Sequence, residues 1–149
     1  MLKNVDPLLT PDLLFVLAAM GHGDELAIVD ANFPGDSVAR QTCHGRLLHL
    51  AGVAVPEAVR AVLSVLPLDE FVDTPVRRMA TGDSNGELPP VQAEVQATID
   101  NAAGRHWPMG ELGRFAFYEA AKACYAVVLT SERRLYGNVL IKKGVVVVA

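Results

Sequence analysis

The sequence predicts an α/β fold, in which helices cover both faces of one central sheet. Segments with the 3.6-residue periodicity of helices alternate along the chain with short apolar runs of strand length. Apolar runs such as residues 26–29 show no polar alternation, which is typical of strands that are buried on both faces. The length of 149 residues suits one domain. We therefore expect a single three-layer domain over residues 1–149.

The first helix and strand have clear boundaries in the sequence. Thr10 can cap a helix whose first position is Pro11, and proline suits that position. An apolar stripe continues to Met20, and Gly21 is expected to end the helix as a C′ glycine. Residues 26–29 then form the first predicted strand.

The later elements are predicted from the same signals. In chain order we expect a turn at 33–36, an irregular or short helical segment at 37–44, a strand at 46–50, a helix at 55–66, a strand around 76–79, a loop at 81–90, a helix at 91–102, a loop at 106–110, a helix at 114–123, a strand at 125–130, and a last strand at 139–141 that leads through a turn or bulge at 142–144 to residues 145–148.

Composition and charge exclude several classes of protein. The net charge of −4 and the lack of a basic run make nucleic acid an unexpected partner. The longest apolar runs are far shorter than the ~20 residues of a membrane span, and the N-terminus lacks the pattern of a secretory signal. Cys43 and Cys124 have no CxxC spacing, so we expect reduced thiols in a cytoplasmic protein. The mean hydropathy of +0.27 is somewhat apolar for a free monomer, which favours surface buried between subunits.

His22 is the first candidate for chemistry. It lies between Gly21 and Gly23, so a small ligand can approach its backbone closely. Histidine exchanges protons near neutral pH, which suits a general acid or base. Asp30 follows the next strand, at the carboxyl end where open α/β sheets bind ligands. The alternative is a histidine in a turn that has only a structural role.

Two further segments carry polar groups that suit a ligand. Arg114 and Tyr118 lie four residues apart on one helix and share a face. Arg114 is in the first turn, where a cation opposes the helix dipole, so stability does not explain it. Tyr136, Gly137 and Asn138 place a phenol, an accessible backbone and an amide within three residues. The alternatives are a solvated arginine beside a half-buried tyrosine, and a simple turn into the last strand.

Other common sites lack their sequence signatures. The GxG at residues 21–23 precedes a strand and has no third glycine, so the dinucleotide fingerprint fails, and no P-loop is present. The residues that could bind a metal show no paired-ligand spacing: His22, Asp24, His44, His49 and His106. No GxSxG elbow supports a serine hydrolase. We therefore expect no metal and no cofactor.

Three segments together resemble the fucose mutarotase and ribose pyranase family. They are GHGDELAIVDANFPG at residues 21–35, GRFAFYEAAKACYAVV at 113–128 and YGNVLIKKGVV at 136–146, and the N-terminal MLKNVDPLLTPDLLFVLAAM also fits. The resemblance implies an enzyme that exchanges the anomers of a reducing monosaccharide without a cofactor or metal. It also implies a ring-like homo-oligomer whose sites can lie near subunit interfaces.

The resemblance assigns expected roles to the candidate residues. It implies that His22 is the proton donor and that the sugar is bound by Asp30, Arg114, Tyr136, Gly137 and Asn138. Tyr118 is a further candidate for sugar binding, and either Tyr136 or Tyr118 is expected to serve the second proton transfer. The ribose pyranase branch tends to carry histidine at the position of Arg114, so the arginine favours L-fucose mutarotase. The alternatives are a D-ribose pyranase, a non-catalytic sugar-binding subunit and, more remotely, a metal-dependent hydrolase.

Overall fold

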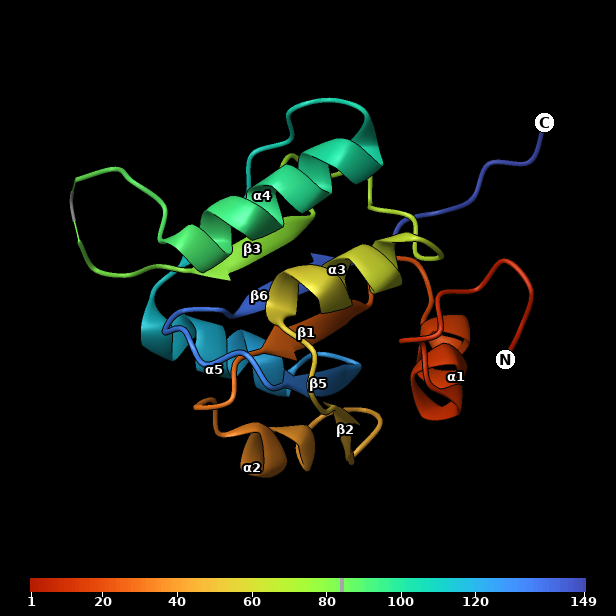
Figure 1. The fold of residues 1–149 in the computed structure, drawn as a ribbon, viewed down its shortest axis with the longest axis horizontal. Helices are drawn as coiled ribbons and strands as arrows, with labels where there is room; N and C mark the ends of the chain where they lie inside the picture. The colour runs from red at the N-terminus through yellow and green to blue at the C-terminus, as the bar shows by residue number, and fades with distance from the viewer. Residues whose placement is uncertain (84) are drawn as a thin grey trace.

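The structure is a computed structural model that describes residues 1–83 and 85–149. It contains a six-stranded sheet and five helices, which Figure 1 shows as a layered arrangement. The helices are α1 (Pro11–Ala19), α2 (Gly35–Ala39), α3 (Val55–Leu63), α4 (Pro90–Ala103) and α5 (Arg114–Lys122). The strands are β1 (Glu25–Val29), β2 (Leu47–Leu50), β3 (Val76–Met79), β4 (Gly110–Leu112), β5 (Ala126–Thr130) and β6 (Val139–Lys142).

The sheet is mixed, with the strand order β2-β5-β1-β6-β3-β4. β1 pairs in parallel with β5, and β5 pairs in parallel with β2. β6 is antiparallel to both of its neighbours, β1 and β3. Of the described strands only β6 runs against the others, so its first residues lie beside the end of β1 and its last residues lie beside the start of β1.

Helices bury both faces of this sheet, as the unbroken apolar strands predict. Along β1, Leu26 and Ile28 face the core formed with α1, α3 and α4, whereas Ala27 and Val29 face the core formed with α2 and α5. This alternation is the two-residue period of a strand, applied to two apolar cores instead of one. The prediction of a single three-layer α/β domain is confirmed.

Most predicted elements appear within a few residues of their predicted bounds, and the exceptions have local causes. β4 was missed, because a three-residue edge strand shows no periodicity. The expected irregular or short helical segment at 37–44 begins with the second half of the short helix α2, whose first residues fall in the predicted turn. The predicted loop at 81–90 includes Ser84, which lies outside the described residues.

The C-terminal valines leave the sheet. Residues 145–148 have no regular structure and are exposed, although β-branched residues favour strands. Figure 1 shows this end of the chain extending away from the domain. The last backbone hydrogen bonds on the β1 side are those of Lys143 with Gly23 and Asp24, and on its other side Gly144 donates its backbone N–H to the carbonyl of Pro67.

Lysine, and not glycine, caps the end of α1. The Lys143 ammonium donates to the carbonyls of Leu17 (2.8 Å) and Met20 (2.5 Å), and these carbonyls have no partner within the helix. Gly21 does not have the positive φ expected of a C′ glycine, whereas Gly23 does (φ 85°). The turn that carries His22 is therefore fixed by the end of β6, since Gly23 also donates its backbone N–H to Lys143 O.

The close approach of Gly144 to the backbone of Leu68 and Asp69 predicts a large effect of a single methyl group. A Cβ on Gly144 would overlap the carbonyl oxygen of Leu68 and lie 2.8 Å from the Cα of Asp69. Because backbone atoms cannot rotate away, we expect Gly144→Ala to lower the free energy of unfolding by about 2 kcal/mol. Thermal unfolding would register this as a fall in Tm of roughly 4–8 °C.

Gly21→Ala is the matched control, because a Cβ there meets only Asp24 Oδ2 at an ordinary 3.7 Å. A Tm of Gly144→Ala equal to that of Gly21→Ala would contradict the close approach of Gly144 to the backbone of Leu68 and Asp69.

In the described part of the chain, no helix is both long enough and apolar enough to span a membrane.

Candidate functional site

Asp30 anchors a polar cluster at the carboxyl end of β1. Its side chain is buried and accepts three hydrogen bonds, from the backbone N–H groups of Asn32 (3.0 Å) and Gly137 (3.2 Å) and from Asn138 Nδ2 (3.1 Å). Burial raises the pKa of the Asp30 carboxyl above its ordinary value, and these hydrogen bonds reduce but do not cancel that effect. A buried carboxylate at this edge of the sheet is a strong acceptor for a ligand's hydroxyl groups.

The segment 136–138 is locked onto Asp30. Asn138 accepts the backbone N–H of Asp30 on Oδ1 (2.9 Å) and donates to the same residue's carboxylate, so the two side chains hold each other. Tyr136 adopts a left-handed backbone (φ 64°), which is uncommon for a bulky residue. The tight packing of Gly137 explains its identity, because a Cβ there would lie 3.0 Å from Glu132 Cγ and 3.3 Å from Val91 Cγ2.

α5 supplies the opposite wall. Arg114 is the first residue of this helix and is exposed, and its Nε donates to the hydroxyl of Tyr118 one turn later (3.1 Å). This hydrogen bond raises the pKa of the Arg114 guanidinium above its ordinary value. The ring of Tyr118 packs against Phe33 at 5.4 Å between centroids, which fixes the phenol beside the end of β1.

These walls enclose a cavity of about 230 Å³, lined by Asp30, Asn32, Phe33, Met79, Arg114, Tyr118, Leu135, Tyr136 and Asn138. The cavity is smaller than the roughly 300–1,000 Å³ of typical drug-binding pockets, so its size suits a single small ring. The structure thus brings together six of the seven predicted site residues. Five line the cavity, and Gly137 lies outside the lining but donates its backbone N–H to Asp30.

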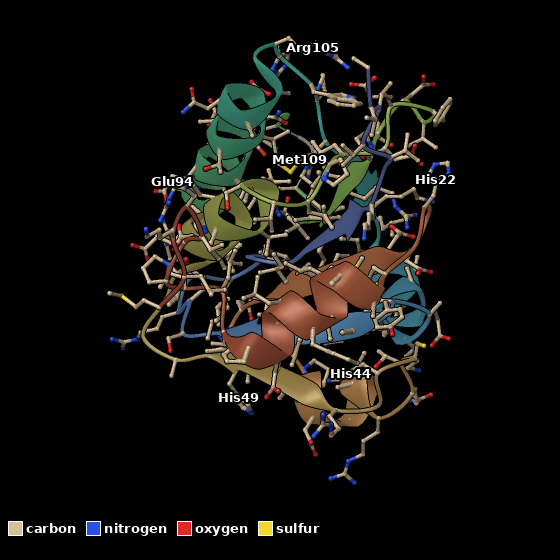
Figure 2. The ribbon with its side chains drawn as sticks, turned by 90° about the vertical axis from the view of Figure 1, so that its right-hand side faces the viewer. His22, His44, His49, Glu94, Arg105 and Met109 are labelled. Carbon is tan, nitrogen blue, oxygen red and sulfur yellow. The ribbon has the colours of Figure 1, made fainter. Side chains whose placement is uncertain are left out.

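His22 is the exception, because it lies at the other end of β1. The turn that holds it precedes Glu25, whereas Asp30 follows Val29, and strand residues rise about 3.3 Å each, so roughly 20 Å separates the two ends. Figure 2 shows His22 and Glu94 on opposite sides of the molecule, and Glu94 pairs with Arg134, two residues before Tyr136. Within one chain, His22 cannot reach the cavity.

His22 has a partner that the sequence did not indicate. Its Nε2 lies 3.0 Å from Oδ1 of the buried Asp69, and its half-exposed ring packs against Phe71 at 5.4 Å between centroids. Burial opposes the negative charge of Asp69, but hydrogen bonds from Phe71 N–H and His22 outweigh it and lower the pKa of Asp69. This acid–histidine pair orients the imidazole and leaves its other nitrogen available for proton transfer.

An ion-pair network supports the loop that carries Tyr136. The guanidinium of Arg134 donates to both carboxylate oxygens of the buried Glu132 (2.9 Å each) and to Glu94 of α4 (2.7 and 3.0 Å). The hydrogen bonds from Arg134 hold the pKa of Glu132 at about 2, well below its ordinary value. No sequence pattern indicated this role, because residues 131–134 have the composition of a solvated turn.

Among residues 1–83 and 85–149, no three side chains of His, Cys, Asp or Glu lie close enough together to hold a metal ion. The histidines considered as ligands are dispersed: Figure 2 shows His44 and His49 in the lower part of the molecule, well below His22. Asp24 is engaged in the turn, since its carboxylate accepts the backbone N–H of Gly21 at 2.7 Å. Cys43 and Cys124 are both free thiols.

Comparison with known proteins finds relatives over the full length of the chain. The sequence profile of the RbsD / FucU transport protein family matches residues 3–146. The fucose mutarotase of Bos taurus is 45% identical, over 97% of this chain and 94% of its own. The L-fucose mutarotase of Histophilus somni is 37% identical, over 97% of each chain.

Solved structures share the whole fold. The crystal structure of protein Atu2016 superimposes with a TM-score of 0.96 at 52% identity, covering 99% of this chain and 97% of that one. The fucose mutarotase of Streptococcus pneumoniae, crystallised in complex with L-fucose, superimposes with a TM-score of 0.87 at 37% identity, covering 98% and 100% of the two chains.

Proposed function

Because the chain belongs to the RbsD / FucU family, we propose that it is an L-fucose mutarotase, an isomerase that interconverts the α and β anomers of the sugar. The observation that carries this proposal is the small cavity in which Asp30, Arg114 and Tyr136 converge from three separate segments. A monosaccharide presents hydroxyl groups that both donate and accept, so binding one needs acceptors and donors held at fixed positions.

The cavity residues divide into groups that bind the sugar and groups that hold them. The Asp30 carboxylate accepts hydrogen bonds from sugar hydroxyls, and the Arg114 guanidinium donates to sugar oxygens. Gly137 and Asn138 act mainly by holding Asp30, because their N–H groups already donate to its carboxylate. The apolar side chains of Phe33, Met79 and Leu135 provide a surface for the methyl group of a 6-deoxy sugar.

The reaction consists of two proton transfers and a reversible ring opening. A base takes the proton of the anomeric hydroxyl while an acid protonates the ring oxygen. The bond between the anomeric carbon and the ring oxygen then breaks, and the anomeric oxygen becomes the carbonyl oxygen. After rotation about the adjacent carbon–carbon bond, the reverse steps close the ring on the other carbonyl face. His22 serves one transfer, and Tyr136 or Tyr118 serves the other. No electron or group is transferred, so the proposed reaction needs neither cofactor nor metal.

We propose that His22 acts on the sugar from a neighbouring subunit, because it lies about 20 Å from Asp30 in its own chain. In the proposed site, His22 of the partner subunit faces the Asp30 cavity. Exposed apolar side chains flank both ends of this contact: Phe71 beside His22, and Leu135 and Phe115 at the cavity. Such residues are compatible with surfaces that are covered in an oligomer.

The contact joins two different faces of the protein, so it is heterologous. Repetition of a heterologous contact produces a ring if the rotation closes. We therefore propose a ring-like homo-oligomer with one shared site at each contact. The free thiols of Cys43 and Cys124 are compatible with the cytoplasm as its location.

The substrate assignment is tested by following anomer exchange with saturation-transfer NMR. Purified protein is expected to accelerate exchange between α- and β-L-fucose well above the rate in buffer, and to accelerate D-ribose pyranose–furanose exchange less. Faster exchange of ribose than of fucose would identify a ribose pyranase instead. Binding of L-fucose without any acceleration would identify a non-catalytic sugar-binding subunit.

A further inference from the structure

We propose that Gln92 is a positioning residue of the sugar site, which it controls by fixing the peptide group between Tyr136 and Gly137. This inference rests on the proposed function, because it assigns Gln92 to the same cavity. Gln92 does not line the cavity and is fully buried in the first turn of α4. A buried amide side chain needs hydrogen-bond partners, and the partners of Gln92 determine what it holds in place.

The amide of Gln92 joins two segments of the cavity wall. Its Nε2 donates to the carbonyl of Met79 at 2.8 Å and to the carbonyl of Tyr136 at 2.9 Å. Met79 is the last residue of β3, and its side chain lines the cavity. One side chain from α4 therefore links the end of a strand to the segment that carries Tyr136.

The peptide group between Tyr136 and Gly137 is held from both sides. Its carbonyl oxygen accepts from Gln92, and its N–H donates to Asp30 Oδ2 at 3.2 Å. Because the peptide group is planar, a rotation that releases the carbonyl also turns the N–H away from Asp30. Gln92 thus fixes the orientation in which the Asp30 carboxylate receives its backbone hydrogen bond.

The conformation of Tyr136 makes this restraint necessary. Its left-handed backbone is unfavourable for a bulky residue and persists only where surrounding contacts impose it. Val91, the neighbour of Gln92, packs against Gly137 from the same helical turn. The first turn of α4 therefore holds the segment by one apolar contact and one hydrogen bond.

Arg78 fixes which way the Gln92 amide faces. Its Nη1 donates to Gln92 Oε1 at 3.2 Å, and its Nη2 is held by Glu111 at 2.6 Å. With the oxygen of the amide occupied by Arg78, the nitrogen must face the two carbonyls. Arg78 is outside the cavity lining, so its effect on the sugar passes through Gln92.

Gln92→Met tests the proposal, because methionine keeps the length of the side chain and removes both donated hydrogen bonds. Gln96→Met is the matched control. Gln96 lies one turn later on α4 and also makes three hydrogen bonds, to Asp100, Trp107 and Met109, but none to the cavity wall. Two readouts are measured on the intact protein: hydrogen exchange of the Gly137 amide without sugar, and the KM and kcat of L-fucose anomer exchange.

We expect Gln92→Met to speed exchange of the Gly137 amide and to raise KM about tenfold, with kcat changed less, whereas Gln96→Met changes neither. Equal rates of hydrogen exchange at the Gly137 amide in the two variants would overturn the positioning role of Gln92, even if the protein proved not to be a mutarotase. Conversely, if hydrogen exchange at Gly137 is faster in Gln92→Met but the protein does not act on fucose, the proposed function is rejected and the positioning role is kept.

If Gln92→Met does not fold, Arg78→Met decides the question, because it frees the Gln92 amide without creating a buried void. We expect Arg78→Met to speed hydrogen exchange of the Gly137 amide less than Gln92→Met does, and to raise KM for L-fucose by about threefold. Unchanged Gly137 exchange and unchanged KM in Arg78→Met would then overturn the proposal.

Discussion

Replacing His22 with alanine is expected to slow L-fucose anomer exchange by about 10²–10⁴-fold, the usual contribution of a general acid or base. The change should leave the fold intact, because the His22 side chain is half-exposed and its only side-chain hydrogen bond in the described structure is to Asp69. Saturation-transfer NMR measures the rate. His49→Ala is the matched control, since His49 is an exposed histidine on β2, away from the cavity.

Mixing two inactive variants tests whether the site is shared between subunits. Neither His22→Ala nor Asp30→Ala can build a complete site with its own copies. In a mixed ring, however, the intact His22 of one variant faces the intact Asp30 of the other. After unfolding and joint refolding in equal amounts, about one quarter of the contacts should regain both groups.

Recovery to about a quarter of the wild-type rate would support the shared site. A mixture as inactive as its two components would contradict the shared site, because a site built within one chain cannot be complemented in this way.

For the single variant, L-fucose anomer exchange at the wild-type rate in His22→Ala, with an unchanged Tm, would show that His22 has no part in the mechanism.

The sequence predicted the architecture well because most elements carry strong local signals. The strands β1 and β5 are continuous apolar runs, and α1 begins at a Thr–Pro pair, so none of the three depends on distant contacts for its identification. The strand that was missed, β4, has three residues at the edge of the sheet and is defined by its pairing with β3. The valines at 145–148 have the composition of a strand, but Lys143 makes the last backbone hydrogen bonds to the segment before β1.

The sequence likewise predicted one part of the site, the residues that line the cavity, and not the residues that support them. The residues that line the cavity come from short segments with distinctive composition, and the structure brings Asp30, Arg114 and Tyr136 together as expected, while their roles toward the sugar stay predictions. The supporting residues were missed. Asp69, Gln92 and Glu132 are ordinary polar residues in the sequence, and their importance arises from contacts with partners that only the fold brings near. The separation of His22 from Asp30, by contrast, follows from the strand that the sequence predicted between them.

Glu132→Gln is expected to be the most destabilising substitution among the polar residues around the site. The carboxylate of Glu132 is 4% exposed and bound by Arg134, and its pKa of about 2 lies below the ordinary value of 4.5. A difference of this size corresponds to about 3 kcal/mol of folding free energy at pH 7. Because the pKa is lowered by folding, this stabilisation is complete above pH 4.5 and is lost as the pH falls towards 2.

Urea unfolding at matched protein concentration measures this effect, since the stability of the proposed ring would depend on concentration. Glu132→Gln should lower the free energy of unfolding by about 3 kcal/mol at pH 7, and this difference from wild type should decrease steadily below pH 4.5. Glu94→Gln is the control, because Glu94 pairs with the same guanidinium but is half-exposed, and such pairs contribute about 0–1 kcal/mol. The free energies of unfolding of Glu132→Gln and wild type could instead differ as much at pH 3 as at pH 7. That result would mean that Glu132 stabilises the fold by packing against Gly137, and not by the charge that Arg134 binds.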